Sequence, residues 1–268
     1  MEISKLFTVK NKVVLVTGGG RGIGEMIATG FVSNGAKVYI SSRSADVCDK
    51  VAARLCEQGP GQCISIPADL QSSEGIKRLV EELKKREDHL DVLVNNAGAY
   101  NSQEFEASTE AKWDEIIDLN LKAPYFLTKS LIPLLTAKST PQDPSRVIMI
   151  GSITVWVNSS IPTYMYSISK AGLHRMTEAL APLLGQRNIT VNTIAPGILR
   201  SEMTKEVFSQ FNESMISEFI KKTIPAGRPG SAEDIAGTCI YLASRAGAYT
   251  NGATIVVDGC LAHSTVDM

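Results

Sequence analysis

The sequence has few of the residues on which metal sites, disulfide scaffolds and charge-driven binding depend. Its 268 residues include 5 cysteines and 3 histidines, and the formal net charge is −1. The scattered histidines and the spacing of Cys48, Cys56, Cys63, Cys239 and Cys260 match no zinc-ligand set and no C-x-x-C pair. We therefore expect reduced thiols and no metal. The balanced charge argues against nucleic acid or an anionic membrane as a partner.

Long apolar runs are also missing. The longest runs are strand-sized, well short of the ~20 residues that cross a bilayer. The first residues, MEISKLFTVKNK, lack the apolar stretch of a signal peptide. We therefore expect a cytoplasmic protein with no membrane contact. A hydrophobic fraction of 44% over 268 residues is enough to bury a sizeable core without disulfides.

Short β-branched runs alternate with longer helical patterns along the whole chain. Strands are predicted at residues 12–16, 37–41, 63–66, 92–94, 146–150, 190–194 and 253–257. Helices are predicted at residues 22–33, 46–57, 73–86, 109–135, 164–184 and 232–244. Nearly continuous apolar strands that alternate with helices are typical of a parallel sheet covered on both faces. The sequence therefore predicts an α/β fold: a Rossmann-like, doubly wound parallel sheet of about seven strands.

No linker, repeat or low-complexity stretch divides the chain. The polar loop at residues 137–145 is too short to separate domains, so we expect a single domain over residues 1–268. Residues 198–224 interrupt the alternation with a helical insert. Because ligands of such sheets bind beyond the strand C-termini, this insert is predicted to be a substrate lid.

A glycine-rich turn, T-G-G-G-R-G-I-G at residues 17–24, follows the first predicted strand and opens a helix. The glycines let the chain turn and a ligand approach closely. The unpaired N–H groups of the helix N-terminus suit a pyrophosphate. The sequence therefore predicts dinucleotide binding at Gly18, Arg21, Gly22, Ile23 and Gly24.

The tip of the second predicted strand bears on which dinucleotide binds. The residues Ile40-Ser41-Ser42-Arg43 include no carboxylate that would accept from the ribose 2′-hydroxyl of NAD. Ser42 stands where that acid is expected, and the guanidinium groups of Arg43 and Arg21 suit a 2′-phosphate. The sequence favours NADP(H), with two ordinary solvated arginines as the alternative.

Tyr166 and Lys170 are four residues apart on a predicted helix, so they share one face. The nearby Tyr164 has Ile168 at that spacing and lacks a cation. A cation beside a phenol favours the phenolate, so we expect Lys170 to lower the pKa of Tyr166 from about 10 towards neutrality. Such a group is suited to exchange a proton with a carbonyl oxygen as general acid.

Ser152 follows the fifth predicted strand, at the edge where sites gather. Its hydroxyl would donate to a carbonyl oxygen as charge develops there. It precedes Tyr166 by 14 residues, and Ser159 and Ser160 in the same loop are competing candidates.

Taken in order, these motifs resemble the short-chain dehydrogenase/reductase family over essentially the whole chain. The matching features are the glycine turn, Asp69, N-N-A-G at 95–98, Asn120, Ser152, Y-S-I-S-K at 166–170, P-G at 196–197 and V-D-G at 257–259. Within the family the pattern most resembles NADPH-dependent β-ketoacyl reductases of the rhamnolipid-pathway kind. Many relatives have a Ser–Tyr spacing one residue shorter, and a second glycine where Cys260 stands.

The resemblance implies roles for individual residues. Lys170 would also hold the nicotinamide ribose, and Asn120, within the predicted helix 109–135, would support a water-mediated proton relay to it. Asn95 would stabilise the centre of the sheet or contact the cofactor. The remaining implied cofactor contacts are Asp69, Leu70, Asn96, Ala97, Gly98, Pro196, Gly197 and Ser201. The assembly would be a homotetramer or homodimer formed through helices 109–135 and 164–184.

The sequence thus predicts an oxidoreductase that reduces a ketone, such as a 3-oxoacyl group or another apolar carbonyl, with NADPH. The alternatives are a secondary alcohol or polyol dehydrogenase working oxidatively, and a catalytically silent nucleotide-binding scaffold. Against the scaffold stands the complete set of Asn120, Ser152, Tyr166 and Lys170. The substrate pocket is predicted to be formed by Tyr100, residues 153–162 and the lid, and to be mostly apolar. Pro182 is expected to kink the helix at residues 164–184 or to end it early.

Overall fold

The computed structural model describes residues 1–157, 161–199 and 213–264. Its centre is a parallel sheet of seven strands in the order β3-β2-β1-β4-β5-β6-β7. The strands are β1 (Val13–Thr17), β2 (Lys37–Ser41), β3 (Gln62–Ser65), β4 (Val92–Asn95), β5 (Ser145–Ile150), β6 (Ile189–Pro196) and β7 (Thr254–Val257). The prediction of a seven-stranded doubly wound parallel sheet is confirmed, and each strand lies within two residues of its predicted bounds.

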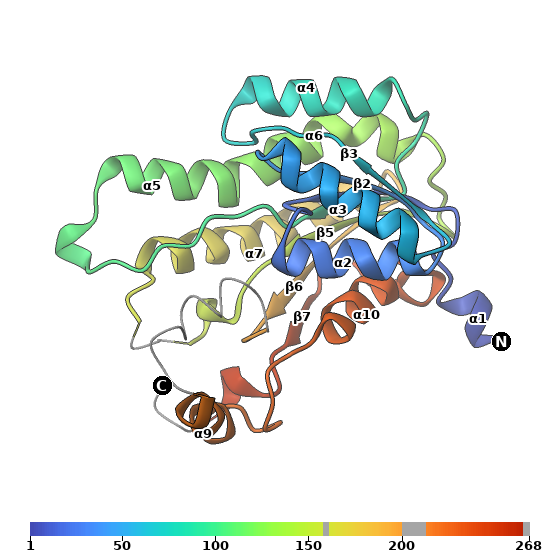
Figure 1. Cartoon of the computed structure of the whole chain (residues 1–268). Helices are drawn as coiled ribbons and strands as arrows, with labels where there is room; N and C mark the ends of the chain where they lie inside the picture. The colour runs from blue at the N-terminus through green and yellow to red at the C-terminus, as the bar shows by residue number, and fades with distance from the viewer. Residues whose placement is uncertain (158–160, 200–212, 265–268) are drawn as a thin grey trace.

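Helices cover both faces of the sheet (Figure 1). One face carries α2 (Gly22–Ser33), α3 (Ala45–Gln58) and α10 (Ala232–Ala243), and the other carries α4 (Ser73–Lys84), α6 (Ala123–Thr136) and α7 (Tyr164–Gly185). Alternate residues of a strand point to opposite faces. Accordingly, Val14 and Val16 of β1 join the first cluster while Leu15 joins the second.

The single helix predicted over residues 109–135 is wrong at its middle. The structure has α5 (Glu110–Ile117), then a π-helical segment η2 (Asp118–Lys122), then α6. Pro124 has no N–H, so the carbonyl of Asn120 loses its regular α-helical donor. Segments of π-helix inside α-helices are often found at functional sites. Here the segment contains Asn120.

Of the two outcomes predicted for Pro182, a kink or an early end of the helix, the early end is wrong, because α7 continues to Gly185 with Pro182 inside it. Its last turn is held by tertiary contacts. Ala181 and Leu184 are buried in the core, and Asn251 Nδ2 donates to the Ala181 carbonyl at 3.0 Å. These contacts offset the hydrogen bond that proline removes.

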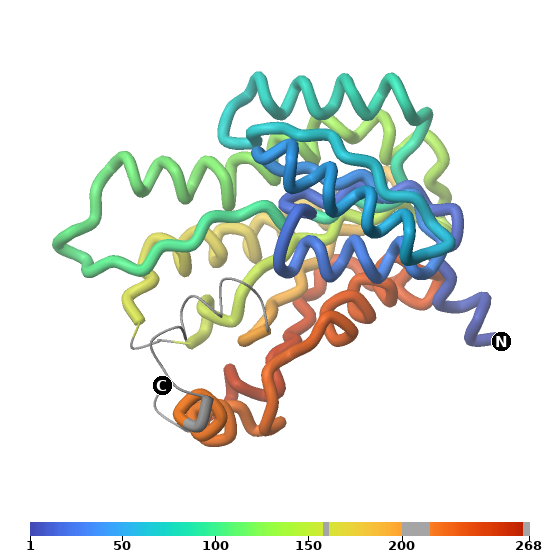
Figure 2. Tube along the Cα trace, viewed as in Figure 1, coloured from blue at the N-terminus to red at the C-terminus, as the bar shows by residue number. Residues whose placement is uncertain are grey.

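Part of the predicted lid at residues 198–224 lies outside the described residues, namely 200–212. The described part includes α9 (Glu213–Thr223), which stands away from the sheet beside η5 (Leu261–His263) (Figures 1 and 2). Just after α9, buried Ile224 packs with Ile153, Ala195 and Leu261. The end of the insert is therefore anchored beside the C-terminal ends of β5 and β6, and its role as a lid stays a prediction.

The other short elements are α1 (Ile3–Leu6), η1 (Phe105–Ala107), η3 (Ile153–Val155) and η4 (Arg245–Gly247). The first of these projects from the body of the molecule at the N-terminus (Figure 2). Among the described helices, none combines the length and apolar character needed to cross a membrane.

Candidate active site

The strand order reverses between β1 and β4, where the chain has left one half of the sheet to build the other. Ligands of open α/β sheets bind in the crevice beyond the strand ends at such a point. The glycine turn follows β1, the N-N-A-G segment includes the end of β4, and Ser152 follows β5. The fold therefore brings these sequence motifs to one edge of the sheet.

The glycine turn forms a confined cradle. Gly18 and Gly22 have φ angles of 66° and 56°, in the left-handed region that favours glycine. A Cβ on Gly18 would lie 2.7 Å from Asn96 Nδ2, and one on Gly24 would lie 2.2 Å from the Gly18 carbonyl oxygen. The first hydrogen bond of α2 joins Glu25 N to the Arg21 carbonyl at 3.3 Å. The N–H groups before it suit a pyrophosphate.

Asn96 and Thr17 fix this turn to the end of β4. Asn96 Nδ2 donates to the carbonyls of Thr17, at 2.8 Å, and Gly18, at 3.3 Å. Thr17 Oγ1 accepts from the backbone N–H groups of Asn96 and Ala97, each at 3.0 Å. The amide of Asn96, predicted as a cofactor contact, is thus already used within the protein. Thr17 as a brace was not foreseen from the sequence.

The predicted 2′-phosphate residues gather beside the turn. Arg21 and Arg43 are exposed, and neither has an ion-pair partner among the described residues. Ser42 is half-buried, and its hydroxyl lies 2.9 Å from Cys48 Sγ. The Ala68 N–H donates to the Ser42 carbonyl at 3.0 Å, which brings the following Asp69 and Leu70 alongside. This region offers two unpaired cations to an anion.

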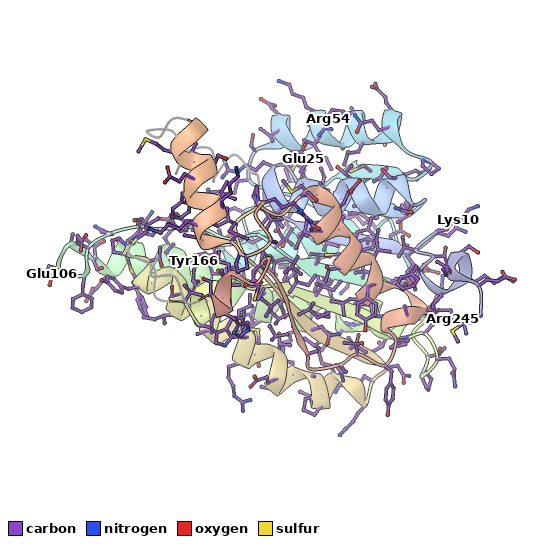
Figure 3. All side chains as sticks on the ribbon, turned by 90° about the horizontal axis from the view of Figure 1, so that it is seen from below. Lys10, Glu25, Arg54, Glu106, Tyr166 and Arg245 are labelled. Carbon is purple, nitrogen blue, oxygen red and sulfur yellow. The ribbon has the colours of Figure 1, made fainter. Side chains whose placement is uncertain are left out.

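The chemical groups meet where β5 ends against α7. Ser152 is 7% exposed, Tyr166 is half-buried and Lys170 is 4% exposed. Lys170 Nζ donates to the Ile150 carbonyl at 2.7 Å and lies 5.6 Å from the centre of the Tyr166 ring. The ring of Tyr100 meets that of Tyr166 edge-on, with centroids 5.3 Å apart. Figure 3 shows Tyr166 among packed side chains, while Glu106 and Lys10 project at the periphery.

The expectation that Lys170 lowers the pKa of Tyr166 is wrong for this structure. Removal from water raises the pKa of Tyr166 to about 12, and a hydrogen bond with Ser152 lowers it by less. The same loss of water lowers the pKa of Lys170 to about 8. At neutral pH Tyr166 is therefore a protonated phenol, and Lys170 is mostly a cation.

Asn120 is fully buried, and its side chain makes three hydrogen bonds within the protein. Its Oδ1 accepts from the Ala99 N–H at 2.7 Å, and its Nδ2 donates to the Ala99 carbonyl at 2.9 Å and to Ser169 Oγ at 3.0 Å. A Cβ on Gly98 would lie 3.2 Å from Asn120 Oδ1 and 3.7 Å from Lys170 Nζ. Asn120 thus ties the loop after β4 to α7, beside the lysine.

Asn95 lies inside the sheet, as its predicted role of stabilising the centre of the sheet requires. It is buried, and its Nδ2 donates to Thr128 Oγ1 at 3.1 Å and to Met149 Sδ at 3.3 Å. These partners lie on α6 and β5. The contacts favour the sheet-stabilising role over a cofactor contact.

His174, unassigned from the sequence, belongs to the same cluster. Its Nε2 accepts from the Ser152 N–H at 3.3 Å, and it lies 2.1 Å from the position of a Cβ on Gly151. Burial, with the nearby Lys170 charge, lowers the pKa of His174 to about 4, so the imidazole is a neutral acceptor. His174 follows Lys170 by four residues and Tyr166 by eight, so the sequence spacing already indicates that the three side chains share one face of the helix.

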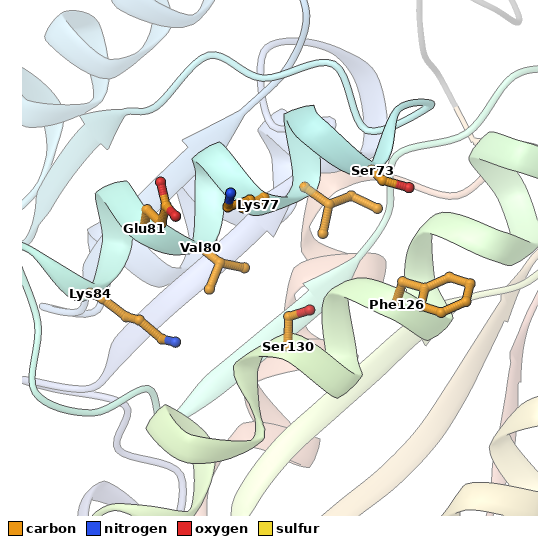
Figure 4. Close-up of a pocket in the computed structure, with 8 residues that line it drawn as sticks. Ser73, Lys77, Val80, Glu81, Lys84, Phe126 and Ser130 are labelled. Carbon is orange, nitrogen blue, oxygen red and sulfur yellow. The ribbon is translucent and has the colours of Figure 1, made fainter.

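The remaining predicted residues lie at the end of β6, at the same edge of the sheet, or outside the described residues. Pro196 ends β6, and the N–H of Gly197 donates to the Val257 carbonyl at 3.0 Å. Ser201 and the competing candidates Ser159 and Ser160 lie outside the described residues. A groove between α4 and α6 (Figure 4) contains none of the predicted site residues; it is lined by Ser73, Ile76, Lys77, Val80, Glu81, Lys84, Phe126 and Ser130.

A dinucleotide cradle at the strand switch point and a buried Ser–Tyr–Lys cluster define an oxidoreductase that uses a nicotinamide cofactor. Comparison with known proteins agrees. A family model described as "Enoyl-(Acyl carrier protein) reductase" matches residues 18–261. The chain belongs to the short-chain dehydrogenase/reductase family, as the resemblance of its motifs predicted, and is an enzyme.

Individual relatives within the family include 3-oxoacyl-[acyl-carrier-protein] reductases. The rhamnolipids biosynthesis 3-oxoacyl-[acyl-carrier-protein] reductase of Pseudomonas aeruginosa is 39% identical over 94% of this chain and 97% of its own length. The 3-oxoacyl-[acyl-carrier-protein] reductase FabG of Chlamydia pneumoniae is 34% identical over 96% of this chain and 99% of its own. A solved Pseudomonas aeruginosa RhlG/NADP active-site complex superimposes with a TM-score of 0.91 at 37% identity, over 98% of this chain and 100% of the other.

Proposed function

We propose that this protein reduces a ketone to a secondary alcohol with NADPH, and that Tyr166 is the general acid. The observation that carries the proposal is the convergence of Ser152, Tyr166 and Lys170 at the end of β5. Two 3-oxoacyl reductases among the relatives support the reaction class. The relative solved with NADP supports the cofactor.

The cofactor is NADP(H), and the residues of the cradle fit it. The helix N-terminus at Gly22, Ile23 and Gly24, with Gly18, would receive the pyrophosphate. Arg21 and Arg43, whose guanidinium groups are unpaired among the described residues, would hold the 2′-phosphate together with the hydroxyl of Ser42. The remaining contacts are proposed at Asp69, Leu70, Asn96, Ala97, Gly98, Pro196, Gly197 and Ser201, with Tyr166 and Lys170 at the nicotinamide ribose.

When bound, NADPH supplies the hydride that reduces the carbonyl carbon. The Ser152 hydroxyl donates to the carbonyl oxygen as negative charge develops on it. The O–H bond of Tyr166 breaks, its proton passes to that oxygen, and the alcohol forms. The cation of Lys170 stabilises the phenolate that is left, and Asn120 is assigned to the relay that returns a proton through water.

The raised pKa of Tyr166 favours the reductive direction. A phenol with a pKa of about 12 is protonated at neutral pH and therefore starts the cycle as an acid. An alcohol dehydrogenase working oxidatively would need the phenolate in its resting state. Reduction is therefore favoured over the alternative of alcohol or polyol oxidation.

We assign an apolar carbonyl, such as a 3-oxoacyl group, as the substrate. The described aromatic side chains of the cluster are the ring of Tyr100, which meets that of Tyr166 edge-on, and exposed Trp156, which packs edge-on to His174 at 5.2 Å. Lys221 and Lys222, in the last turn of α9, are exposed and would suit an acidic carrier. A polyol would instead require several polar side chains around the carbonyl.

The assembly and location are proposed from the sequence, with some support from exposed apolar side chains. A homotetramer or homodimer would cover Trp113, Tyr125 and Phe126 on α5 and α6, and Ile168 on α7, all of them exposed in the single chain. Apolar side chains gathered on neighbouring helices are typical of subunit contacts. The location proposed is the cytoplasm.

The test is the absorbance decay of NADPH, and in parallel NADH, with a panel of acceptors. The panel contains an acetoacetyl thioester, ethyl acetoacetate, a cyclic diketone, an aryl ketone, a keto sugar and an enoyl thioester. We expect NADPH-dependent turnover that is fastest with the apolar ketones. Consumption with the enoyl thioester alone would replace ketone reduction by double-bond reduction. Binding of NADPH without any turnover would favour the silent scaffold.

A further inference from the structure

The catalytic serine has a hydrogen-bonding partner that the proposed mechanism does not use. Ser152 caps the short helix η3, and its Oγ accepts from the Thr154 N–H at 3.2 Å. The Thr154 hydroxyl donates to the same Oγ at 3.0 Å. Two donors from one residue therefore converge on the oxygen of Ser152.

A hydroxyl group has two lone pairs to accept with and one proton to donate. Because Thr154 occupies both lone pairs of Ser152, the Ser152 proton must point elsewhere. Tyr166 lies beside Ser152 where β5 ends against α7, and the interaction with Ser152 lowers the pKa of its phenol, as donation from Ser152 would. The direction of donation is therefore set along the path from Thr154 through Ser152 to Tyr166.

The backbone of Ser152 is anchored as firmly as its side chain. Its N–H donates to His174 Nε2, and the imidazole lies so close to Gly151 that no side chain would fit there. Since His174, Lys170 and Tyr166 all lie on α7, the same helix that carries the acid also holds the serine. The Ser152 oxygen therefore has little freedom to rotate away from Thr154.

We infer that Thr154 is a positioning residue for carbonyl reduction, whose hydroxyl directs the Ser152 proton towards Tyr166 and the substrate oxygen. The inference rests on the proposed function and adds a residue to it. Hydrogen bonds in a chain polarise one another, so donation by Thr154 makes Ser152 a stronger donor. The stabilisation that Ser152 gives the carbonyl oxygen grows as negative charge develops there. Thr154 should therefore raise kcat and leave KM nearly unchanged.

The variants Thr154→Val and Thr154→Ser separate this role from simple packing. Valine keeps the shape and the backbone N–H bond to Ser152 but removes the hydroxyl, whereas serine keeps the hydroxyl. We expect Thr154→Val to lower kcat about tenfold with KM changed less than about twofold, the size of one hydrogen bond to a developing charge. Thr154→Ser should retain most of the wild-type kcat.

A second readout needs no substrate. Tyrosine labelled with ¹³C at Cζ reports hydrogen bonding at the phenol by NMR, and the variant Tyr166→Phe assigns the resonance. Thr154→Val should shift the Tyr166 signal, and Thr154→Ser should leave it near its wild-type position. If the panel of ketones gives no turnover, this measurement still tests the chain of hydrogen bonds, so the two failures are distinguishable.

The matched control is Thr136→Val, at the end of α6, where the hydroxyl donates to the Ile132 carbonyl at 2.9 Å away from the site. It should leave kcat and the Tyr166 resonance unchanged. Wild-type kcat and resonance in Thr154→Val would overturn the inference, as would equal losses in Thr154→Val and Thr154→Ser. Should the valine variant fail to fold, Thr154→Ala removes the same hydroxyl.

Discussion

The two ends of the proposed cleft are built differently. At the chemical end, Ser152 and Lys170 are held to the surrounding chain by hydrogen bonds, and loss of water shifts the pKa values of Tyr166 and Lys170. At the phosphate end, Arg21 and Arg43 are exposed and unpaired among the described residues. Groups that move protons are fixed in place, while groups that bind a charged ligand are left open to receive it.

This difference has a physical reason. Proton transfer needs donors held within a few tenths of an ångström, and a buried network provides that rigidity. A phosphate is a large, strongly hydrated anion, and exposed guanidinium groups can reach it without the cost of burying an unpaired charge. Substitutions at the phosphate end should therefore affect cofactor affinity, and those at the chemical end should affect rate.

The largest effect at the phosphate end is expected from Arg43→Ala. A charge-assisted hydrogen bond contributes about 1.5–3 kcal/mol, so the Kd for NADPH should rise roughly ten- to hundredfold. The affinity for NADH, which has no 2′-phosphate, should hardly change. Fluorescence titration with both cofactors measures this, with the exposed Arg175→Ala on α7 as control. Equal losses for NADPH and NADH would mean that Arg43 does not read the 2′-phosphate.

The chemical end should respond to pH through Lys170. Its pKa is about 8, and the cationic form is the one proposed to stabilise the phenolate. Activity should therefore be full below pH 8 and fall about tenfold per pH unit above it, the slope of a single ionisation. The measurement is kcat/KM for ketone reduction against pH. A profile that stays flat up to pH 10 would contradict a catalytic role for the lysine charge.

The smallest effect concerns the stability of the segment beside the chemical end. Cys260 has a φ angle of 73°, a left-handed conformation that side chains disfavour. Cys260→Gly should relieve this strain and raise the free energy of unfolding by about 0.5–1 kcal/mol, after the entropy cost of glycine. Urea unfolding measures it. Asn188→Gly, at φ 55°, is the matched control and should gain less, because asparagine tolerates this region.

The sequence predicted well what depends on local pattern. Strand positions followed from buried apolar runs, and the cradle from its glycines, whose left-handed φ angles the structure contains. The family pattern also explains Cys260, since relatives usually have glycine at a position that is left-handed here. The π-helical segment around Asn120 was not predicted, although Pro124 provides a local cause.

Tertiary effects could not be predicted from spacing. The pairing of Tyr166 with Lys170 suggested a lowered phenol pKa, but removal from water raises it. Pro182 was expected to kink the helix or end it early, but α7 continues past it, because the core contacts of Ala181 and Leu184 hold the last turn. Thr154 and His174 gain their importance only from the path of the chain around Ser152.

The central claim, that Tyr166 donates the proton in an NADPH-dependent ketone reduction, is tested most directly by Tyr166→Phe. The variant removes one hydroxyl from a packed ring, so NADPH should bind within about threefold of wild type while kcat falls about 10²- to 10⁴-fold. Single-turnover loss of NADPH absorbance with the best ketone of the panel, together with a binding titration, measures both. A variant that binds NADPH and retains kcat within tenfold of wild type would contradict the account.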